Sequence, residues 1–287
     1  MQRPTILVTG AAGQVGFELV RVLAPHGDIV ATDRATLDLA SADAIVAAVR
    51  GARPNLIVNA GAYTAVDRAE DERAQAHAVN AVAPGVLAEE ARRLGAVLIH
   101  YSTDYVFDGA RTSPYPEDAP TGPLNVYGAT KLAGEDAIAA VGAHAVVLRT
   151  SWVYGTRGRN FLLTIRRLAS EREELRIVAD QRGVPNWSRV LAEATARIVA
   201  GGLAPLAERA GLYHMSSTGD ASWHEFASAI VGGSGRPRVV PITTAEYPLP
   251  ARRPPYGVLG TARFEATFGF ALPDWRDALA RCSATGE

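Results

Sequence analysis

The stretch TGAAGQVG, Thr9–Gly16, decides the fold of this chain. It follows a short apolar run, Ile6–Val8, that is typical of a buried strand, and it precedes residues 14–23, whose apolar side chains recur at helical spacing. Glycines at such a turn allow a tight bend and let a pyrophosphate approach the backbone amides at the helix N-terminus. A turn that only joins strand to helix is the alternative. We predict a dinucleotide-binding turn formed by Gly10, Gly13, Gln14, Val15 and Gly16.

An acidic residue stands where this motif needs one. Asp33 ends the second predicted strand, residues 28–32, about 20 residues after the glycines. A carboxylate there accepts hydrogen bonds from an adenosine ribose and repels a 2′-phosphate, which favours NAD. Arg34 follows it and would pair with that phosphate, which favours NADP, although a solvated surface charge is an equally good interpretation. The cofactor is therefore expected to be NADPH or NADH, with the preference open.

Strands and helices alternate along the first half of the chain. Residues 56–58, 96–100 and 145–148 are apolar runs that predict strands, and residues 42–49, 74–94 and 127–140 predict helices. This alternation indicates an α/β fold with a doubly wound, Rossmann-type parallel sheet. We expect the NAD(P)-binding domain in residues 1–150, with some later segments returning to it, and a smaller C-terminal substrate-binding domain in residues 151–287.

The second half of the chain has a different pattern. Residues 160–170, 187–200 and 223–230 predict helices, and short strands are expected at residues 176–178 and 212–214. In residues 232–257 prolines are so dense that we expect no regular structure but loops and short elements of a smaller, substrate-facing part. Apolar residues continue through this stretch, so it is not a linker between independent domains.

Composition excludes several classes of function. The 287 residues are 48% hydrophobic with a net charge of −1, so no strong field would gather nucleic acid or a membrane surface. The one cysteine, Cys282, excludes an intramolecular disulfide and a cysteine metal cluster. No apolar run approaches the length of about 18 residues that spans a membrane, and the N-terminus lacks a signal-peptide pattern. We expect a cytoplasmic protein that acts on a small molecule.

A tyrosine and a lysine lie four residues apart in VYGATK, Val126–Lys131, and share one face of the predicted helix. A nearby ammonium lowers the pKa of a phenol, which makes Tyr127 a credible proton donor to a carbonyl oxygen. Lys131 would also bond the ribose hydroxyls of the nicotinamide. Thr103, at the end of the fourth strand, offers a hydroxyl to the same carbonyl oxygen. Such pairs also occur by chance on helix surfaces, but the preceding turn and Thr103 favour a catalytic group.

Several motifs together resemble a known family. TGAAGQVG, NAGAYTAVD, HYSTDYVFDG, PLNVYGATKLAGE and RTSWVYG are similar to the extended short-chain dehydrogenase/reductases, and more narrowly to the dTDP-4-dehydrorhamnose reductase family. DQRGVPNW, GLYHMSSTGDASWHEFA and ARRP extend the resemblance over nearly the whole chain. The resemblance implies reduction of the C4 ketone of a dTDP-linked 4-keto-6-deoxy sugar. From the charge balance we expect no nucleic acid or membrane partner, and we expect a monomer or homodimer.

The resemblance also assigns residues. Thr103, Tyr127 and Lys131 would be catalytic, and Thr103, Asp104 and Trp152 would touch the sugar nucleotide. The cofactor would be lined by Gly13, Gln14, Val15, Asp33, Asp38, Leu39, Ala62, Tyr63, Thr64 and Tyr101. Arg253 is suited to bind a substrate pyrophosphate, because the paired N–H donors of its guanidinium group fit phosphate oxygens. A solvated surface arginine is an equally good interpretation. Asp38 is equally well read as a turn aspartate, Asp104 as a strand-end cap and Trp152 as a core residue.

Departures from the family pattern fall in the second half. Asn186 and Trp187 replace the usual continuation after DQxGxP, and PYGVLGT follows ARRP, so the sugar is the least defined part of the prediction. Glu18 matches a magnesium ligand of some relatives, but Ser188 and Arg189 stand where another carboxylate is needed, so no metal site is predicted.

Two alternative functions remain open. One is a 4-ketoreductase for another dTDP-deoxysugar of specialised metabolism. The other is a non-catalytic subunit resembling the regulatory subunit of methionine adenosyltransferase. A dehydratase of the same fold needs an acid pair after the threonine, and here Asp104 is followed by Tyr105.

Overall fold

The structure is a computed structural model and describes residues 3–232 and 237–285. Within these residues the central sheet has six parallel strands in the order β10-β5-β4-β3-β1-β2. The strands are β1 (Thr5–Thr9), β2 (Asp28–Ala31), β3 (Leu56–Asn59), β4 (Val97–Thr103), β5 (Ala145–Thr150) and β10 (Gly211–His214). Strand β2 lies on one side of β1 and strand β3 lies on the other, so the order in which strands are added to the sheet switches at β1. The predicted Rossmann-type parallel sheet is confirmed.

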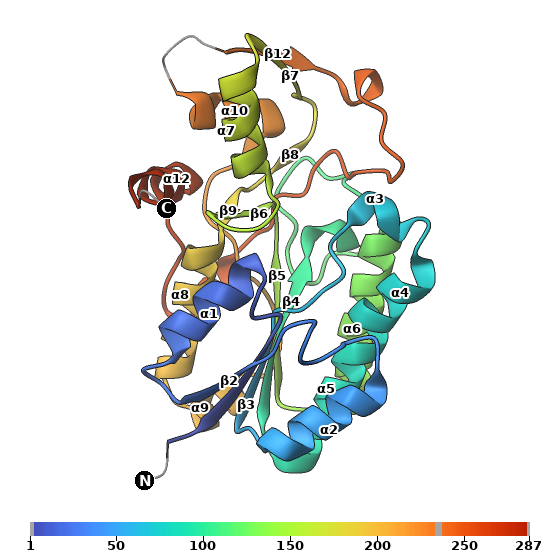
Figure 1. The fold of residues 1–287 in the computed structure, drawn as a ribbon, viewed down its shortest axis with the longest axis vertical. Coiled ribbons are helices and arrows are strands. Elements are labelled where there is room, and N and C mark those ends of the chain that lie inside the picture. The colour runs from blue at the N-terminus through green and yellow to red at the C-terminus, as the bar shows by residue number, and fades with distance from the viewer. Residues whose placement is uncertain (1–2, 233–236, 286–287) are drawn as a thin grey trace.

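Helices cover both faces of this sheet (Figure 1). The first half contributes α1 (Gln14–Leu23), α2 (Ala42–Ala52), α3 (Val66–Ala69), α4 (Arg73–His77), η1 (Ala78–Val82), α5 (Ala83–Leu94), η2 (Asp104–Val106) and α6 (Val126–Val141). Helix α1 packs against α8 (Ser188–Ala200) on one face, and α2, α5 and α6 pack together on the other. The segments 188–200 and 211–214 thus return to the sheet from the second half of the chain.

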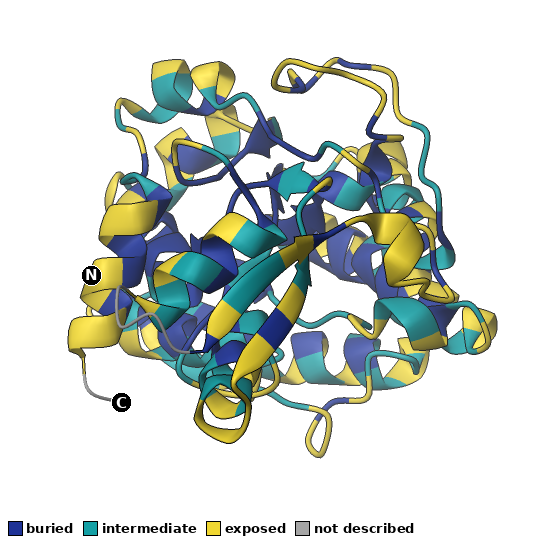
Figure 2. Ribbon diagram, turned by 90° about the horizontal axis from the view of Figure 1, so that it is seen from above, coloured by how far each residue is buried: buried dark blue, intermediate teal, exposed yellow. Residues whose placement is uncertain are grey.

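The four inner strands, β5, β4, β3 and β1, are buried on both sides because their side chains alternate between two cores. Ile6 and Val8 of β1 pack under α1 and α8, whereas Leu7 packs with Ile57 and Leu98 under α2 and α5. Figure 2 shows buried residues gathered in the middle of the molecule and exposed residues on the outward faces of the helices. This double burial explains why the strands read as continuous apolar runs.

The remaining elements all come from the second half of the chain. They are β6 (Val153–Tyr154), α7 (Phe161–Glu171), β7 (Glu174–Val178), β8 (Arg182–Gly183), β9 (Asn186–Trp187), α9 (Leu203–Glu208), β11 (Ala221–Ser222), α10 (Trp223–Val231), β12 (Arg238–Ile242), η3 (Thr244–Glu246), α11 (Ala262–Phe268) and α12 (Trp275–Ala284). Helices α7 and α10 pack on the β7–β12 pair through Ile165, Leu175 and Ala227. None of the described helices is both long and apolar enough to cross a bilayer.

One expectation about regular structure was wrong. The stretch 232–257 contains strand β12, which pairs with β7 in a parallel two-stranded sheet; residues 233–236 lie outside the described residues. Pro241 is tolerated because this strand has a partner on one side only. The helix predicted over residues 74–94 is confirmed as the continuous helical run of α4, η1 and α5, in which η1 is a π-helical turn that ends two residues before Pro84. Such turns are frequent at functional sites.

Candidate active site

The glycine turn is shaped by close backbone packing. Gly10 has φ +68°, and a side chain there would lie 2.6 Å from the Cα of Gly61. A Cβ on Gly16 would lie 2.1 Å from the carbonyl oxygen of Gly10, so only glycine lets α1 begin directly on the turn. The N-cap residue of α1, Gly13, has no side chain to cover the first amides of the helix. These amides and the helix dipole suit a phosphate group.

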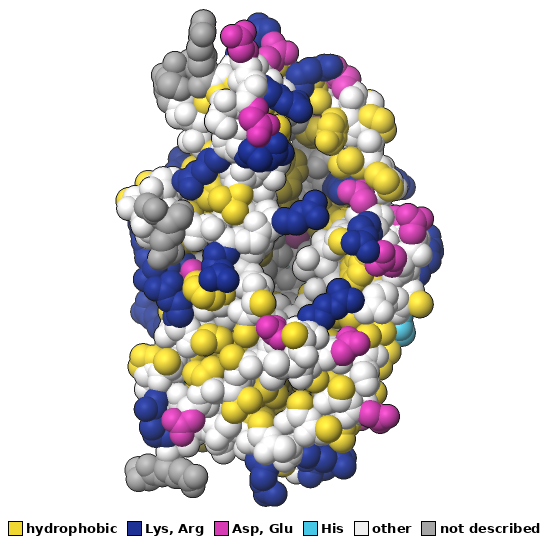
Figure 3. Space-filling model, viewed as in Figure 1, with side chains coloured by type: hydrophobic (Ala, Val, Ile, Leu, Met, Phe, Trp, Pro, Cys, Tyr) yellow, Lys and Arg dark blue, Asp and Glu magenta, His cyan; other side chains and the backbone are white. Residues whose placement is uncertain are grey.

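A cavity of about 730 Å³ opens above this turn. Figure 3 shows the hollow on this face of the molecule, with Lys and Arg side chains beside it. Most residues proposed from the sequence line it, namely Gly10, Gly13, Gln14, Val15, Asp33, Arg34, Asp38, Leu39, Ala62, Tyr63, Thr64, Tyr101, Thr103, Tyr127, Lys131 and Trp152. They lie at or after the carboxyl ends of β1 to β5 and on helices α1 and α6, at the edge of the sheet where the switch-point rule places a ligand.

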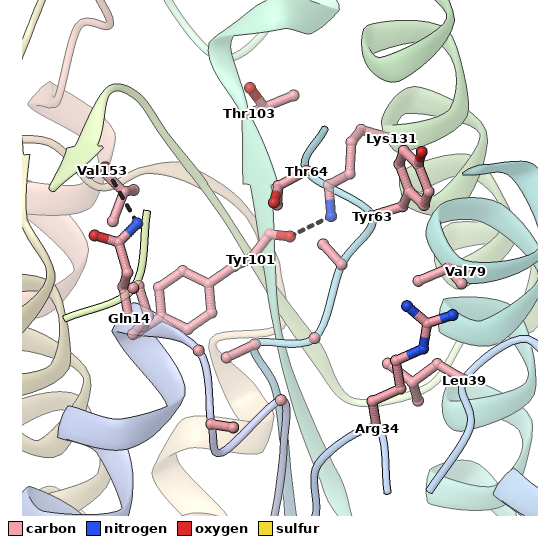
Figure 4. Close-up of a pocket in the computed structure, with 18 of the residues that line it drawn as sticks. Gln14, Arg34, Leu39, Tyr63, Thr64, Val79, Tyr101, Thr103, Lys131 and Val153 are labelled. Carbon is pink, nitrogen blue, oxygen red and sulfur yellow. Dashed lines mark hydrogen bonds between the residues drawn. The ribbon is translucent and has the colours of Figure 1, made fainter. Parts of the chain in front are cut away.

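Asp33 and Arg34 differ in how free their side chains are. One carboxylate oxygen of Asp33 accepts hydrogen bonds from the amides of Ala35 (3.0 Å) and Thr36 (3.2 Å) and from the hydroxyl of Thr36 (3.0 Å). These bonds, those with Thr36 foremost, lower the pKa of Asp33. Arg34 is exposed at the cavity and has no ion-pair partner within 4.0 Å among the described residues. Its guanidinium extends from the loop after β2 toward η1 (Figure 4).

The wall beside the glycine turn is fixed by Asn80 of η1. Its side-chain oxygen accepts from the amide of Tyr63 at 2.8 Å, and its nitrogen donates to the Tyr63 carbonyl at 3.0 Å and to Thr130 of α6 at 3.2 Å. The π-helical turn thus presents one buried amide that ties the loop after β3 to the helix of Tyr127. This holds Ala62, Tyr63 and Thr64 along the cavity (Figure 4).

Tyr127 lies in the first turn of α6, which Asn125 caps by accepting a hydrogen bond from the amide of Gly128 at 2.8 Å. Burial raises the pKa of Tyr127 to about 12, against the lowering effect of a hydrogen bond with Thr103. The Thr103 hydroxyl also donates to Asp104 at 3.1 Å. We expected a nearby ammonium to lower the pKa of Tyr127; the pKa is raised instead, because burial dominates. The phenol keeps its proton throughout the neutral range.

Lys131 lies one turn further along α6 and is buried. Its amino group donates to the carbonyl oxygen of Tyr101 at 2.6 Å and lies 3.2 Å from Nε2 of His100 (Figure 4 draws the first contact). Burial lowers the pKa of Lys131 to about 8. An ammonium has three donors, so one remains for a ligand in the cavity.

Trp152 lines the cavity in a strained conformation. It has φ 43°, which is rare for any residue with a side chain, and strain of this kind clusters at ligand sites. Its ring stacks on Trp223 with centroids 3.5 Å apart. A Cβ on Gly183 would lie 2.4 Å from the Trp152 ring, so the indole fills the space that a side chain would take.

The residues that depart from the family pattern do not face the cavity. Asn186 is fully buried, donates to the carbonyls of Ser151 (2.8 Å) and Val184 (3.0 Å), and accepts from the amide of Ser217 (2.7 Å). Trp187 belongs to the core. Asn186 therefore secures the loop that carries Trp152 rather than contacting a ligand.

Three predicted site residues lie outside the cavity lining. Gly16 lies within the turn, beneath Gly10. Asp104 is buried behind Thr103, and burial raises its pKa to about 7. Arg253 forms a two-pronged ion pair with Asp67 of α3, at 2.5 and 2.7 Å, which joins the loop before Tyr256 to the first half of the chain. The substrate contacts of Asp104 and Arg253 stay predictions.

Sequence reasoning missed other lining residues. These are Leu37, Gln75, Val79, Ser102, Thr150, Ser151, Val153, Gly158 and Arg159; the lining residues Ala12, Ala60 and Gly61 lie in the motifs TGAAGQVG and NAGAYTAVD, which already pointed to the cofactor. Thr150 ends the observed strand β5 and Ser151 follows it, so the rule that ligands lie at strand ends could have found both. Gly158 and Arg159 approach the cavity through the loop after β6, which no local motif marks.

The cavity fits a nicotinamide dinucleotide. Its glycine turn can hold a pyrophosphate, Asp33 and Arg34 stand at one end, and Tyr127, Thr103 and Lys131 meet at the other. A phenol, a hydroxyl and an amino group at one end of such a cavity are suited to proton transfer at a carbonyl group.

Comparisons with known proteins agree with this geometry. A family model described as "RmlD substrate binding domain" matches residues 4–286. The dTDP-4-dehydrorhamnose reductase of Burkholderia thailandensis is 50% identical, over 96% of this chain and 97% of that protein, and that of Escherichia coli K12 is 43% identical, over 96% of each. The crystal structure of dTDP-4-dehydrorhamnose reductase from Bacillus anthracis in complex with NADP has a TM-score of 0.93 at 36% identity, covering 99% of this chain and 100% of that chain. The chain therefore belongs to the RmlD family, the family of the dTDP-4-dehydrorhamnose reductases.

Proposed function

We propose that this protein reduces the C4 ketone of dTDP-4-dehydro-L-rhamnose to dTDP-L-rhamnose with NADPH or NADH. The observation that carries the proposal is that Tyr127, Thr103 and Lys131 meet in the cavity that the glycine turn also lines. The named relatives are reductases of this substrate, and one of them was crystallised with NADP. The intact catalytic group argues against a purely regulatory subunit.

Tyr127, Thr103 and Lys131 each have a separate role in the proton transfer. When bound, the reduced nicotinamide supplies a hydride to the carbonyl carbon. Tyr127 donates its phenolic proton to the carbonyl oxygen, on which negative charge develops. Thr103 hydrogen-bonds Tyr127 and offers its hydroxyl to the same oxygen. Lys131 holds the ribose hydroxyls of the nicotinamide and stabilises the phenolate that Tyr127 becomes.

Absorbance at the reduced-nicotinamide band tests the activity directly. Purified protein is mixed with dTDP-4-dehydro-L-rhamnose and NADPH, then NADH, and the product is identified by NMR. Oxidation of the cofactor with dTDP-L-rhamnose as product is expected. Oxidation with another dTDP-4-keto sugar only would identify a ketoreductase of specialised metabolism, and no turnover of any such sugar would overturn the proposal.

NADPH is proposed as the preferred cofactor because of Arg34. One carboxylate oxygen of Asp33 already accepts three hydrogen bonds from Ala35 and Thr36. Arg34, by contrast, is exposed at the cavity, and its guanidinium group can bind phosphate oxygens. Arg34→Ala is expected to lower kcat/KM for NADPH about tenfold or more, the effect of losing a charge-assisted hydrogen bond, and to change that for NADH by less than about twofold.

The matched control for Arg34 is Arg172→Ala, an exposed arginine at the end of α7 and outside the cavity lining. It removes the same charge and should leave both values unchanged. Equal losses of kcat/KM with NADPH and with NADH in Arg34→Ala would show that Arg34 does not bind the 2′-phosphate of NADPH.

Gly183→Ala is expected to weaken sugar-nucleotide binding through Trp152. The new methyl would meet the indole at 2.4 Å and push it from its place against Trp223. Overpacking of this kind costs about 1–3 kcal/mol, so KM for the sugar nucleotide should rise about tenfold while the Kd for NADPH stays constant. Gly51→Ala in α2, where nothing lies within 4 Å, is the control. An unchanged KM would show that Trp152 does not shape the sugar site.

A further inference from the structure

A row of buried polar side chains crosses the sheet beneath the cavity. Thr9 is the register partner of Asn59, and Asn59 is the register partner of His100, in the neighbouring parallel strands β1, β3 and β4. Register partners in parallel strands project from the same face. The row begins at the residue before Gly10 and ends at Lys131 of α6. All four side chains are at most 2% exposed.

The members of the row are in hydrogen-bond contact from end to end. The Thr9 hydroxyl donates to the side-chain oxygen of Asn59 at 2.6 Å, and the nitrogen of Asn59 lies 2.9 Å from Nδ1 of His100. Nε2 of His100 lies 3.2 Å from the amino group of Lys131. His100 thus touches Lys131 with one ring nitrogen and Asn59 with the other, and it does not line the cavity.

The proton positions in this row depend on the state of Lys131. Burial lowers the pKa of His100 well below its usual value, so the ring is neutral with one N–H. If Asn59 donates to Nδ1, the ring proton is on Nε2 and faces the Lys131 nitrogen, which accepts it only as a neutral amine. If the Asn59 amide is turned by 180°, Nδ1 donates to Asn59 and Nε2 accepts from the ammonium. Thr9 can donate or accept, so both arrangements are satisfied.

We propose that His100 is a positioning residue of the reductase: it holds the amino group of Lys131 at the cavity and, with Asn59, accommodates the lysine with or without its proton. The inference rests on the proposed function, in which the Lys131 ammonium stabilises the deprotonated Tyr127. At neutral pH the arrangement with the proton on Nδ1 applies, because the pKa of Lys131 is about 8.

Other titratable groups around Lys131 bear on its pH dependence. Glu135, on the same helix, favours the ammonium and is itself paired with Arg149 of β5. The remaining groups that face the amino group or the reacting end of the cavity are Tyr127 on α6, His100 and Tyr101 on β4, and Asp104 behind Thr103. His100 is the one of these that contacts the Lys131 nitrogen through a side chain at hydrogen-bond distance in the described structure.

Two substitutions separate the contacts of His100. His100→Asn keeps an amide near the position of Nδ1 and loses the contact with Lys131. His100→Gln reaches further and returns an amide oxygen to the position of Nε2. We expect kcat to fall about tenfold in His100→Asn, the equivalent of one hydrogen bond, with KM for the sugar nucleotide within about twofold of wild type. His100→Gln should stay within about threefold of wild type in kcat.

The pH profile distinguishes positioning from general support of the fold. Loss of an acceptor for the ammonium lowers the pKa of Lys131, so the alkaline limb of kcat should move to lower pH in His100→Asn and return in His100→Gln. Equal kinetics and equal pH profiles in the two variants would overturn the proposal, even if both were less stable than wild type.

Nitrogen-15 NMR of the wild-type protein without substrate gives a test that does not need turnover. Below pH 7, the His100 ring is expected to carry its proton on Nδ1, with Nε2 accepting from Lys131. A ring proton on Nε2 under these conditions would overturn the inference. Absence of turnover in the wild type would instead reject the proposed function, while the NMR result would still decide the arrangement of His100.

Discussion

Tyr127→Phe is expected to reduce kcat by about 10²–10⁴-fold, the usual contribution of a positioned general acid. The phenol keeps its proton because burial raises its pKa to about 12, and Thr103 hydrogen-bonds it at the cavity. Phenylalanine keeps the ring and its edge-to-face contact with Tyr105, at 5.7 Å between centroids, and removes the proton donor alone. Steady-state rates with saturating NADPH and sugar nucleotide measure the effect.

The control for this substitution is Tyr213→Phe. Tyr213 is buried in β10, its hydroxyl donates to the carbonyl of Arg209 at 2.9 Å, and it is not among the cavity residues. It should keep kcat within about twofold of wild type. A loss below tenfold in Tyr127→Phe would mean that another group, with Asp104 behind Thr103 the nearest acid, supplies the proton.

Arg149→Met is expected to lower the free energy of unfolding by about 3–5 kcal/mol. Arg149 and Glu135 form a two-pronged ion pair at 2.9 and 2.6 Å, with side chains only 3% and 8% exposed. Methionine fills a similar volume but leaves the Glu135 carboxylate buried with Ser102 as its remaining partner. An unpaired buried charge is the costly state, and urea denaturation monitored by circular dichroism measures it.

Two further variants show whether the unpaired charge is the cause. The double variant Arg149→Met with Glu135→Leu removes both charges and should recover most of the lost stability. Arg167→Ala breaks an ion pair with Glu171 in which both side chains are about half exposed, 60% and 49%, and should cost less than about 1 kcal/mol. A loss of similar size in Arg149→Met and Arg167→Ala would contradict this account.

The parallel sheet was predictable because its signals are local. Apolar runs such as LIVN, Leu56–Asn59, are buried on both faces. The glycines Gly10 and Gly16 of the turn are required because a side chain at either position would clash with backbone atoms. The prediction of loops in residues 232–257 was wrong where a long-range contact overrides local preference, because strand β12 forms around Pro241 with β7 as its partner. Local spacing also gave no sign of the π-helical turn η1 within the predicted helix, where Asn80 reaches Tyr63 and Thr130.

The candidate site was predictable where function depends on spacing within one element. Tyr127 and Lys131 share a helix face, and Thr103 ends a strand beside them. Arg253 shows the limit of such reasoning, because its suitability for a phosphate gave no sign that Asp67, far away in the sequence, pairs with it. The departures at Asn186 and Trp187 made the sugar the least defined part of the prediction, yet both side chains are buried behind the loop of Trp152.

Sequence alone was thus sufficient for the strand-turn-helix of the cofactor site, for the residue types that transfer a proton and for the family, because each depends on short-range spacing. Folding was needed to set the properties of those residues. Burial, which cannot be inferred from residue spacing, raises the pKa of Tyr127 so that the phenol keeps its proton, and it lowers the pKa of Lys131. The partners of a side chain also come from distant strands: Thr9, Asn59 and His100 share no motif, and parallel register alone brings them into one row that ends at Lys131.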